Sequence, residues 1–372
     1  MTSLPFARIR AWLFEAALPL WAERGVDRVH GGFVEGLNLD GGPALSPFKR
    51  VRVAARQTYV FAHAASLGWA PGRDLSRQGA VHLDNLYQGP ARGWPRRLAP
   101  DNAILDPTPD LYDLAFILFA YAWRGRIDAD ARAGAERALD FIEAHMRAPT
   151  GGFWPSLPTG AHQLQNPHMH LLEACLAAFE TYKAPRFLDL ARELVRLFKT
   201  KFFDGRTLCE IFAPDWARAP GEAGRIIEPG HHFEWVWILA QYARLTGVDM
   251  RDEIVRLIEF AERYGVDPEM GMTVQSVRDD GAPLDSSSRI WPNTERIKAH
   301  LALYETTGAD PRAAVAQSAN LLLNVYLAAP TPGLWIDHLI AGAPAPGPAP
   351  ASSFYHLFLA FSEVLRLERA LS

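Results

Sequence analysis

The stretch from Glu228 to Trp237 places ionisable side chains where a turn ends and an apolar helix begins. Its sequence, EPGHHFEWVW, has two histidines directly after a Pro-Gly pair and a carboxylate three residues after the first histidine. Residues at i and i+3 share one helix face, so we expect Glu234 to reach the ring of His231. Histidine gains and loses a proton near neutral pH, so the pair is suited to general acid–base catalysis. Taken alone, the stretch equally fits an exposed helix start without chemistry.

Similar residues recur along the chain at a nearly constant spacing. A polar or ionisable group follows the predicted start of an apolar helix six times, at Arg56, Asp113, His170, His231, Glu295 and His356. Successive members are 57, 57, 61, 64 and 61 residues apart. Ionisable groups are costly to bury unless they are paired. Six of them at one phase of a repeat therefore predict a shared polar cavity, which favours the catalytic interpretation of His231.

The elements that position these residues also repeat. Glycine-containing turns recur about every sixty residues, at 31–33, 92–94, 151–154, 204–206, 270–272 and 332–335, and a fixed period of this size indicates a repeat architecture. Between the turns, amphipathic segments (129–147, 186–200, 250–263) alternate with segments that are apolar on all sides (111–123, 233–243). A helix that is apolar all round is buried all round.

Buried inner helices wrapped by amphipathic outer helices predict an all-α (α/α)6 barrel of six helix pairs, with short hairpins or turns at the cavity rim. An open α-solenoid is the alternative, but such a fold usually leaves one face of each helix in water. The Ala/Pro/Gly-rich segment 340–350 is expected to be a loop before the last helix. We therefore expect one catalytic domain over residues 1–372.

Composition restricts the partners. The chain has 372 residues, of which 49% are hydrophobic and 22% charged, and its net charge is −4. The sequence has no basic patch of the kind that nucleic acid requires. It also has no apolar run of membrane-spanning length and no signal peptide. The two cysteines, Cys175 and Cys209, have no motif spacing and fit a reducing compartment, so we expect a cytoplasmic protein. The sequence does not determine the oligomeric state.

Individual residues near the repeated positions refine the predicted site. Of the two histidines after Asn166, we expect His168 to bond a loop, whereas His170 has Glu173 at i+3. Arg52 lies one turn before Arg56, and two buried arginines suit sugar hydroxyls or an enediolate oxygen. Tyr112 and Asp113 fit either a structural hydrogen-bond pair or substrate contacts, and Glu295 fits a contact to Arg56 or to the sugar.

With these residues in view, the chain resembles the N-acylglucosamine 2-epimerase superfamily, which includes cellobiose 2-epimerases, sulfoquinovose isomerase and D-mannose isomerase. The resemblance is carried by matching segments that extend nearly from end to end: Arg56-Gln57, Tyr112-Asp113 with Ala115-Phe116, Asn166 to Glu173, Gly230-His231 with Glu234, Trp291 to Glu295, and Phe354 to His356. Where disaccharide epimerases have Trp-Trp-x-Gln-Ala-Glu, this chain has Trp291-Pro-Asn-Thr-Glu295. It is therefore more similar to the monosaccharide isomerase branch, that of D-mannose isomerase and sulfoquinovose isomerase.

The resemblance implies an (α/α)6 barrel and a role for each matching residue. His231 and His356 match the general acid–base pair, and Glu234 matches the carboxylate that orients the first histidine. Arg56 and His170 match residues that hold substrate oxygens and assist ring opening, and Trp291 matches a sugar-stacking tryptophan. The predicted substrate-binding set is Arg52, Tyr112, Asp113, Asn166, Trp291 and Glu295. We expect no cofactor and no metal.

These features predict an aldose–ketose isomerase acting on an unphosphorylated monosaccharide, with D-mannose to D-fructose as the preferred reaction. A sugar 2-epimerase is the main alternative, because two histidines can return a proton to C1 or to the opposite face of C2. The sequence does not determine which of His231 and His356 removes the first proton. Arg52 is the only additional cation expected near the site, which favours a neutral sugar over an anionic one.

Three other functions remain as alternatives. A glycoside hydrolase needs two carboxylates across a cleft, for which Asp113, Glu234 and Glu295 are candidates. A zinc enzyme would use His168, His170 and Glu173, or His231 with His232, although adjacent helical residues diverge by about 100°. A non-catalytic helical scaffold leaves the spacing of the ionisable groups unexplained.

Overall fold

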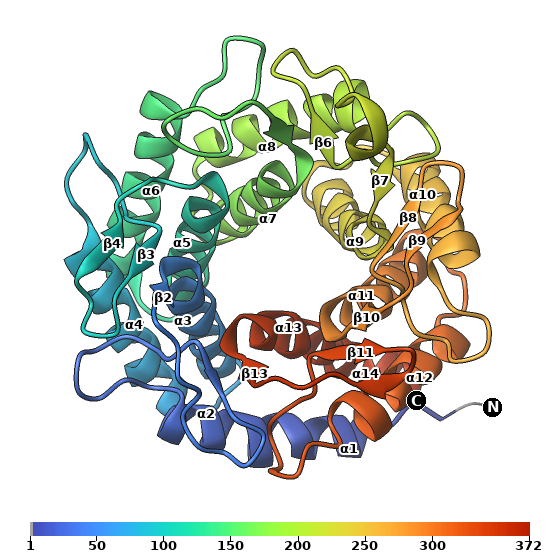
Figure 1. Ribbon diagram of the computed structural model, residues 1–372, viewed down its shortest axis with the longest axis horizontal. Coiled ribbons are helices and arrows are strands. Elements are labelled where there is room, and N and C mark those ends of the chain that lie inside the picture. The colour runs from blue at the N-terminus through green and yellow to red at the C-terminus, as the bar shows by residue number, and fades with distance from the viewer. Residues whose placement is uncertain (1–2) are drawn as a thin grey trace.

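In the computed structural model, which describes residues 3–372, six largely apolar helices stand side by side around a central axis (Figure 1). These inner helices are α3 (Val51–Ser66), α5 (Leu111–Arg124), α7 (Gln165–Tyr182), α9 (Pro229–Thr246), α11 (Ile290–Thr307) and α13 (Phe354–Arg366). Each contacts the next, and α13 contacts α3, so the ring is closed. Closure buries every side of these helices, which is why their sequences are apolar all round. The open solenoid is excluded.

An outer ring of amphipathic helices covers the inner one (Figure 1). Its members are α4 (Pro71–Leu86), α6 (Arg132–His145), α8 (Pro185–Leu197), α10 (Arg251–Gly265), α12 (Arg312–Leu321) and an N-terminal run of α1 (Phe6–Ala11), a π-helical segment (Trp12–Ala17) and α2 (Leu18–Arg24). The outer helices α4, α6, α8, α10 and α12 each pack on the inner helix that precedes them in the chain, and α1 packs on α13. The first helix in the chain therefore completes the last pair, and the predicted (α/α)6 barrel is confirmed.

Shorter helical segments extend or connect these elements. Two π-helical turns continue α8 and α12, at Phe198–Phe202 and Leu322–Tyr326, and α14 (Glu368–Leu371) ends the chain. Short 3-10 helices lie at Ala129–Ala131, Gly221–Arg225 and Ala351–Ser353. Of the helices in residues 3–372, not one combines the length and the apolarity needed to cross a membrane.

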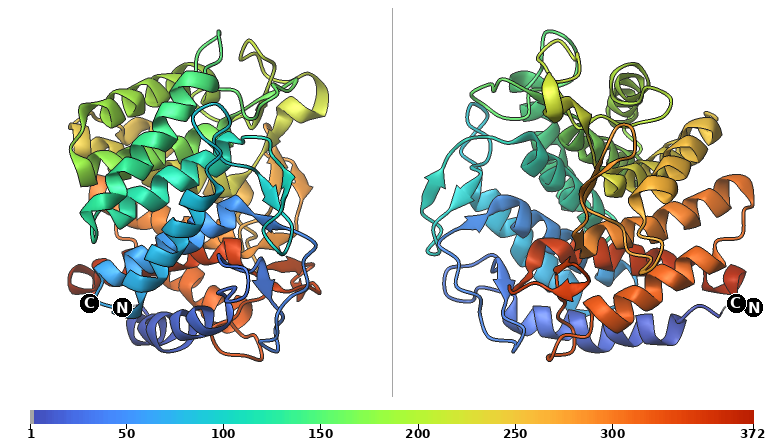
Figure 2. Two further views of the ribbon diagram at one scale, coloured as in Figure 1. Left: turned by 90° about the vertical axis from the view of Figure 1, so that its left-hand side faces the viewer. Right: turned by 45° about the vertical axis from the view of Figure 1, so that its right-hand side comes forward.

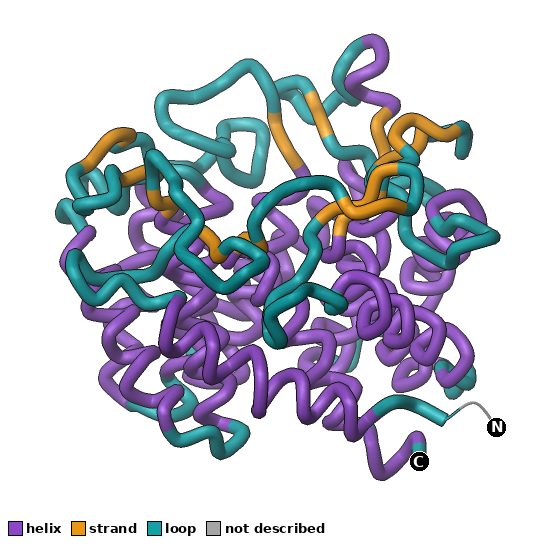
Figure 3. Tube along the Cα trace, turned by 60° about the horizontal axis from the view of Figure 1, so that its bottom comes forward, coloured by secondary structure: helices purple, strands orange, loops and turns teal. Residues whose placement is uncertain are grey.

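Short strands gather at the end of the barrel where the inner helices begin (Figures 2 and 3). They form small antiparallel sheets: β1 (Gly36–Leu37) with β13 (Ala349–Pro350); β2 (Lys49–Arg50), β3 (Arg97–Leu98) and β4 (Ile104–Asp106); β5 (Gln163–Leu164) with β6 (Ile211–Phe212); β7 (Ile226–Ile227), β8 (Ser276–Arg278) and β9 (Pro283–Asp285); and β10 (Ser288–Arg289), β11 (His338–Ile340) and β12 (Ala343–Pro344). The β1–β13 pair, with Gly36 opposite Pro350, joins the first rim loop to the last. The predicted hairpins are confirmed, and segment 340–350 contains two of the strands.

In three of the repeats, a hydrogen bond from the glycine turn to the side chain of the fourth residue of the inner helix holds the turn against that helix. In α7, Nε2 of His168 accepts the N–H of Phe153 (2.9 Å) and Nδ1 lies 2.8 Å from the carbonyl of Leu164. Gly152 has φ +68°, and a Cβ there would lie 2.9 Å from the His168 ring, so only glycine lets the turn approach so closely. The prediction that His168 bonds a loop is confirmed.

The same fastening occurs in the next two inner helices. In α9, His232 accepts the N–H of Leu208 (3.2 Å), and in α11 the amide of Asn293 accepts the N–H of Thr273 (2.8 Å). Buried backbone N–H groups need such partners. His168, His232 and Asn293 therefore mark equivalent positions in three successive repeats.

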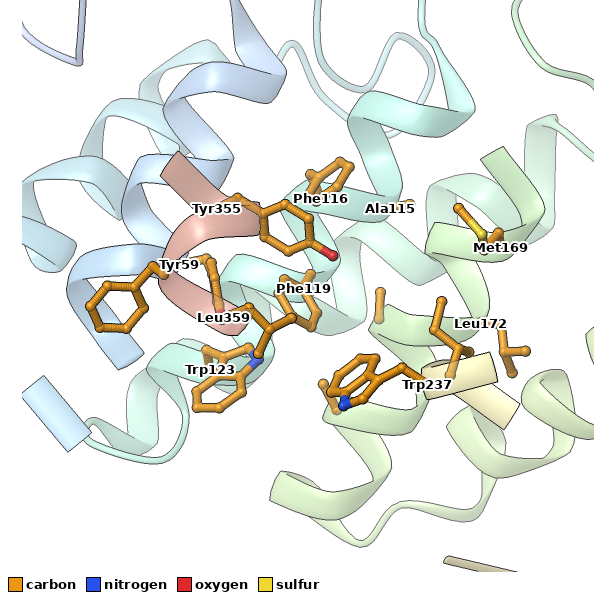
Figure 4. Packing of buried hydrophobic residues seen from close by; sticks show 14 of the residues in the cluster. Tyr59, Ala115, Phe116, Phe119, Trp123, Met169, Leu172, Trp237, Tyr355 and Leu359 are labelled. Atoms are coloured by element: carbon orange, nitrogen blue, oxygen red, sulfur yellow. The ribbon is translucent and has the colours of Figure 1, made fainter. Parts of the chain in front are cut away.

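The core lies between the two rings and contains most of the large aromatic side chains. Trp21 of α2 stacks on Trp335 with ring centroids 5.0 Å apart, and further aromatic residues of α3, α5 and α13 pack together within the inner ring (Figure 4). The two cysteines, Cys175 and Cys209, are buried and unpaired with each other, as expected for small core residues.

Candidate active site

A cavity of about 290 Å³ lies at the hairpin end of the inner ring. Nine of the eleven predicted site residues line it: Arg52, Arg56, Tyr112, Asn166, His170, His231, Glu234, Trp291 and His356. Its wall also contains six residues that the sequence did not indicate: Arg50, Glu228, Gln275, Arg289, Ser352 and Ser353. Because all six inner helices begin here, residues far apart in the chain share one small space.

The depth of each side chain follows from its place in its helix. Arg56, His170, Glu234 and Glu295 are each the sixth residue of an inner helix, and His356 is the sixth residue of the helical run that the 3-10 turn Ala351–Ser353 forms with α13. His231 is only the third residue of α9, and Asp113 is the third of α5. The prediction that all six repeated residues share one position is therefore wrong for these two. Three residues correspond to about 4.5 Å along a helix, so His231 lies nearer the mouth and Glu234 takes the deeper position.

His231 is held by a carboxylate from a loop and not by the one in its own helix. Its Nδ1 lies 2.9 Å from Glu210 and 3.8 Å from Glu228. The expected contact with Glu234 does not form within the described chain. Glu210, in the segment before the 3-10 helix Gly221–Arg225, bonds Nδ1 of His231 instead. Burial alone lowers the pKa of His231, but Glu210 and then Glu228 raise it to about 10. His231 is therefore an imidazolium at neutral pH.

His356 has the opposite electrostatic setting. Its Nδ1 lies 2.7 Å from Oε1 of Glu295, which fixes the orientation of the ring. Burial, together with the cations Arg56 and Lys298, holds the pKa of His356 well below its ordinary value. The ring is therefore neutral, with the Nδ1 proton donated to Glu295 and Nε2 as the basic nitrogen. Glu295 itself is fully buried beneath His356, so the predicted contact with Arg56 or with a sugar is wrong.

Trp291 lies between these two histidines. The centroid of its ring is 5.1 Å from that of His231 and 5.5 Å from that of His356. A Cβ at position 230 would lie 2.5 Å from the indole, so Gly230 of the Pro-Gly turn is required for this packing. The indole therefore forms the wall that joins the acidic and the basic histidine.

At the deeper level lie His170 and two glutamates. Nδ1 of His170 is 3.2 Å from Glu173 and 3.9 Å from Glu234, so the i+3 contact expected for His170 is present. Burial lowers the pKa of His170 to about 4. Within residues 3–372, neither carboxyl oxygen of Glu234 has a hydrogen-bond partner. Burial and the neighbouring Glu295 raise the pKa of Glu234 well above its ordinary value, which favours the protonated form of this carboxyl group.

Arg56 lies deep in the cavity wall. It donates to the carbonyl of Ser352 (3.0 Å) and to the hydroxyl of Tyr112 (2.5 Å), and its guanidinium lies over the ring of Phe116 at 4.1 Å. None of the carboxylates in residues 3–372 pairs with it. Arg56 therefore carries a positive charge that remains available to an oxyanion.

The other arginines of the wall are paired with carboxylates. Arg52 lies 2.6 Å from Asp113, which is buried outside the cavity wall and whose pKa is raised to about 7 by burial. The predicted substrate contact of Asp113 is therefore replaced by this ion pair. Arg50 bonds Glu35 (2.7 Å) and Arg289 bonds Asp337 (2.8 Å). The expectation that Arg52 is the only additional cation near the site is wrong.

The two zinc arrangements considered from the sequence do not form. Both ring nitrogens of His168 and of His232 are bonded to backbone groups, which leaves neither ring free to bind a metal. Three other clusters bring possible ligand atoms within 4.8 Å of one another: His170 with Glu173 and Glu234, His231 with Glu210 and Glu228, and His356 with Glu234 and Glu295. In each cluster the histidine Nδ1 is already hydrogen-bonded to a carboxylate.

The chain is similar to known sugar isomerases and epimerases. The model of the N-acylglucosamine 2-epimerase (GlcNAc 2-epimerase) family matches residues 31–360. The chain is 36% identical to a mannose-6-phosphate isomerase of Rhizobium meliloti (strain 1021), with 97% of each chain covered. It is 24% identical to a D-mannose isomerase of Marinomonas mediterranea, over 74% of this chain and 75% of that one. A crystal structure of D-mannose isomerase superposes with a TM-score of 0.89 at 21% identity, covering 97% of each chain.

Proposed function

Because the chain belongs to the N-acylglucosamine 2-epimerase family, whose members are sugar isomerases and epimerases, we propose that it is an aldose–ketose isomerase that converts D-mannose to D-fructose. The observation that carries this proposal is the pair of histidines on either side of Trp291, of which His231 is protonated and His356 is neutral. Acid and base roles are assigned where environments drive two pKa values apart. The pKa of His231 is raised and that of His356 is lowered.

The proposed proton transfers follow from these charges. Nε2 of His356 removes the proton from C2 of the open-chain aldose, and the electron pair forms the C1–C2 double bond while His231 gives a proton to O1. The cis-enediol then takes the proton from His356 at C1. The O2 proton returns to His231, which restores both histidines and leaves a ketose. Arg56, with no carboxylate partner among the described residues, stabilises the negative charge that develops on oxygen.

Ring opening precedes these steps and requires a proton on the ring oxygen and loss of one from the anomeric hydroxyl. Glu234 is suited to the first task because its raised pKa favours the protonated carboxyl group, which has no hydrogen-bond partner within residues 3–372. His170 is neutral and suited to the second. Tyr112, Asn166 and Arg52 line the cavity and are proposed to bind the sugar hydroxyls. The free, buried cysteines support a reducing compartment such as the cytoplasm.

The test is a product analysis by NMR in D2O with D-mannose. We expect fructose as the first product, with part of the C2 proton retained at C1, because one base serves both carbons. Glucose appearing before fructose would contradict isomerisation and support a 2-epimerase, in which His231 protonates the opposite face of C2. Release of reducing sugar from an aryl glycoside would instead support a hydrolase, and loss of activity with a chelator would support a metal enzyme.

A second candidate substrate is the 6-phosphate of the same sugar. It is favoured by the name of the Rhizobium meliloti relative and by Arg50 and Arg289 in the cavity wall. The carboxylates that pair with both arginines instead support a neutral sugar. The two substrates are distinguished by comparing kcat/KM for D-mannose and D-mannose 6-phosphate in the wild type and in Arg50→Gln and Arg289→Gln. A selective loss of tenfold or more with the phosphate ester would identify these arginines as phosphate ligands.

A further inference from the structure

Lys298 is a fully buried cation directly beneath the proposed site. Its Nζ lies 2.6 Å from Oε2 of Glu295, and both side chains have an exposed fraction of 0%. The ring centroid of Trp237 lies 4.5 Å from the same nitrogen, on the side away from the cavity. Lys298 belongs to neither the cavity wall nor the mechanism described above, although a buried charge of this kind is costly without a purpose.

Glu295 connects this lysine to the basic histidine. One of its oxygens lies 2.7 Å from Nδ1 of His356 and the other lies against Lys298. Glu295 is one of three buried carboxyl groups in this layer, together with Glu173 and Glu234. Lys298 lies among these three carboxyl groups. Burial lowers the pKa of Lys298, but the three carboxyl groups raise it above its ordinary value. Burial raises the pKa of Glu295 and Lys298 opposes this rise, so loss of the cation favours the protonated form of Glu295 further.

The protonation state of Glu295 decides which nitrogen of His356 is basic. A carboxylate accepts the Nδ1 proton and leaves the lone pair on Nε2. A protonated Glu295 donates to Nδ1, and the imidazole then carries its proton on Nε2. In that tautomer the nitrogen that faces the sugar is no longer a base.

We propose that Lys298 is a positioning residue that keeps Glu295 as a carboxylate and thereby holds His356 in the tautomer with a basic Nε2. The proposal rests on the proposed function for its catalytic consequence, because only a reaction that uses His356 as a base is affected. Its structural part, the tautomer, does not depend on the substrate.

The kinetic test is a double-mutant cycle between Lys298→Met and Glu295→Gln. Methionine replaces the lysine with a neutral side chain of similar length, and we expect kcat to fall by about 30-fold or more with KM within about threefold, because sugar contacts are unchanged. In the Glu295→Gln background the same substitution should change kcat by less than about threefold. An unchanged kcat in Lys298→Met, or an equal loss in both backgrounds, would overturn the proposal.

A second measurement needs no turnover. In protein labelled with [15N]histidine, the His356 signals are assigned by their loss in His356→Gln. We expect a protonated Nδ1 and an unprotonated Nε2 in the wild type, and the reverse in Lys298→Met. The same tautomer in both proteins would refute the role of Lys298, whether or not D-mannose is a substrate. Absence of turnover with the expected tautomers would instead refute the proposed function alone.

Lys49 provides the matched control. It is also a buried lysine, and its Nζ lies 2.5 Å from the carboxylate of Asp27 in the rim loops, outside the cavity wall. Lys49→Met should lower thermal stability as much as Lys298→Met without changing kcat. If Lys298→Met does not fold, Lys298→Gln takes its place, since its amide still donates to Glu295; we expect a smaller loss of kcat and a mixture of the two tautomers, and wild-type values of both would overturn the proposal.

Discussion

The inner ring has a cavity at each end, and the larger one lies away from the proposed site. The cavity at the C-terminal ends of the inner helices has a volume of about 390 Å³, against about 290 Å³ at the hairpin end. Its floor is apolar, with Phe119, Trp123 and Trp237 among its residues (Figure 4). The charged groups at its mouth form ion pairs with one another, such as Arg126 with Glu180 and Arg366 with Glu305, both at 2.7 Å.

The hairpin-end cavity differs in what its polar groups leave free. His231 and His356 each use Nδ1 for a carboxylate, and Nε2 has no partner among residues 3–372. In the same wall, and among the same residues, the carboxyl group of Glu234 has no hydrogen-bond partner and Arg56 has no carboxylate partner. At the mouth of the larger cavity, arginines and glutamates neutralise one another in ion pairs. Cavity volume therefore does not identify the site, whereas buried ionisable groups that lack a partner do.

The largest expected effect is a loss of kcat on substitution of the histidines in the hairpin-end cavity, with no such loss at the larger cavity. His356→Gln and His231→Gln should each lower kcat by about a thousandfold, because general acid–base catalysis is lost, while the circular-dichroism spectrum stays helical. Glu305→Gln, at the mouth of the other cavity, should leave kcat within about twofold, because a half-exposed ion pair contributes little. Full activity of both histidine variants would remove the distinction between the cavities.

A change in pH dependence should follow from the carboxylate on His231. Activity requires neutral His356 and protonated His231, so kcat/KM should stay high below pH 6.5 and fall only as pH rises through about 10. Glu210→Gln removes the main cause of the raised pKa, so the alkaline limb should move down toward the ordinary histidine value of about 6.5. The measurement is kcat/KM from about pH 5 to about pH 11; an alkaline limb that does not move would contradict the assignment of His231 as the acid.

The same pair should contribute to stability in a defined pH range. Because the pKa of His231 is raised in the folded protein, its stabilising contribution is fully present below about pH 6.5 and is lost as pH rises through about 10. Glu210→Gln should therefore lower the free energy of unfolding more at about pH 6 than at about pH 10. An equal loss at both values would show that the ion pair does not cause it.

The hydrogen bonds that hold the glycine turns should contribute to stability without contributing to catalysis at the hairpin end. His168→Ala leaves the N–H of Phe153 without its partner and should cost about 1–3 kcal/mol of unfolding free energy. His168→Asn should restore part of this, because Asn293 performs the same task in α11. Both variants should keep kcat within a few-fold once folded. A thousandfold loss in His168→Asn would instead make this histidine part of the reaction.

The smallest effect is expected at the mouth of the larger cavity. Arg126 stacks on Trp123 at 3.8 Å and pairs with the half-exposed Glu180. Arg126→Met should lower the free energy of unfolding by about 1 kcal/mol or less, with kcat and KM unchanged. Chemical denaturation and steady-state kinetics with D-mannose measure both. A change in KM would give this cavity a role that its ion pairs do not indicate.

Most of the ring could be predicted from the sequence because its signals are local. The alternation of amphipathic and wholly apolar helices depends only on which side chains avoid water, and the glycine turns mark the period of the repeat. Nine predicted residues reach one cavity because they follow the starts of inner helices. The shared position of His231 and His170 was wrong by three residues, since counting a period of about sixty does not fix the first residue of each helix.

Of the carboxylate partners of the histidines, only those close in the same helix could be predicted from the sequence. Spacing within a helix correctly joined His170 to Glu173, since i and i+3 lie on one face. The same rule failed for His231, because Glu210 arrives from a loop 21 residues earlier, and no periodicity marks a loop residue. The contact between Lys298 and Glu295 could be inferred only from their i and i+3 spacing in the buried helix α11.

The sequence alone thus determined that six helix starts bring histidines, arginines and carboxylates to a common rim. Only the tertiary structure decided which carboxylate meets which histidine, and therefore that His231 is charged while His356 is neutral. The physical reason is that helical periodicity is set by neighbours in the chain, whereas the pKa of a buried group is set by the charges that folding brings within a few ångströms of it.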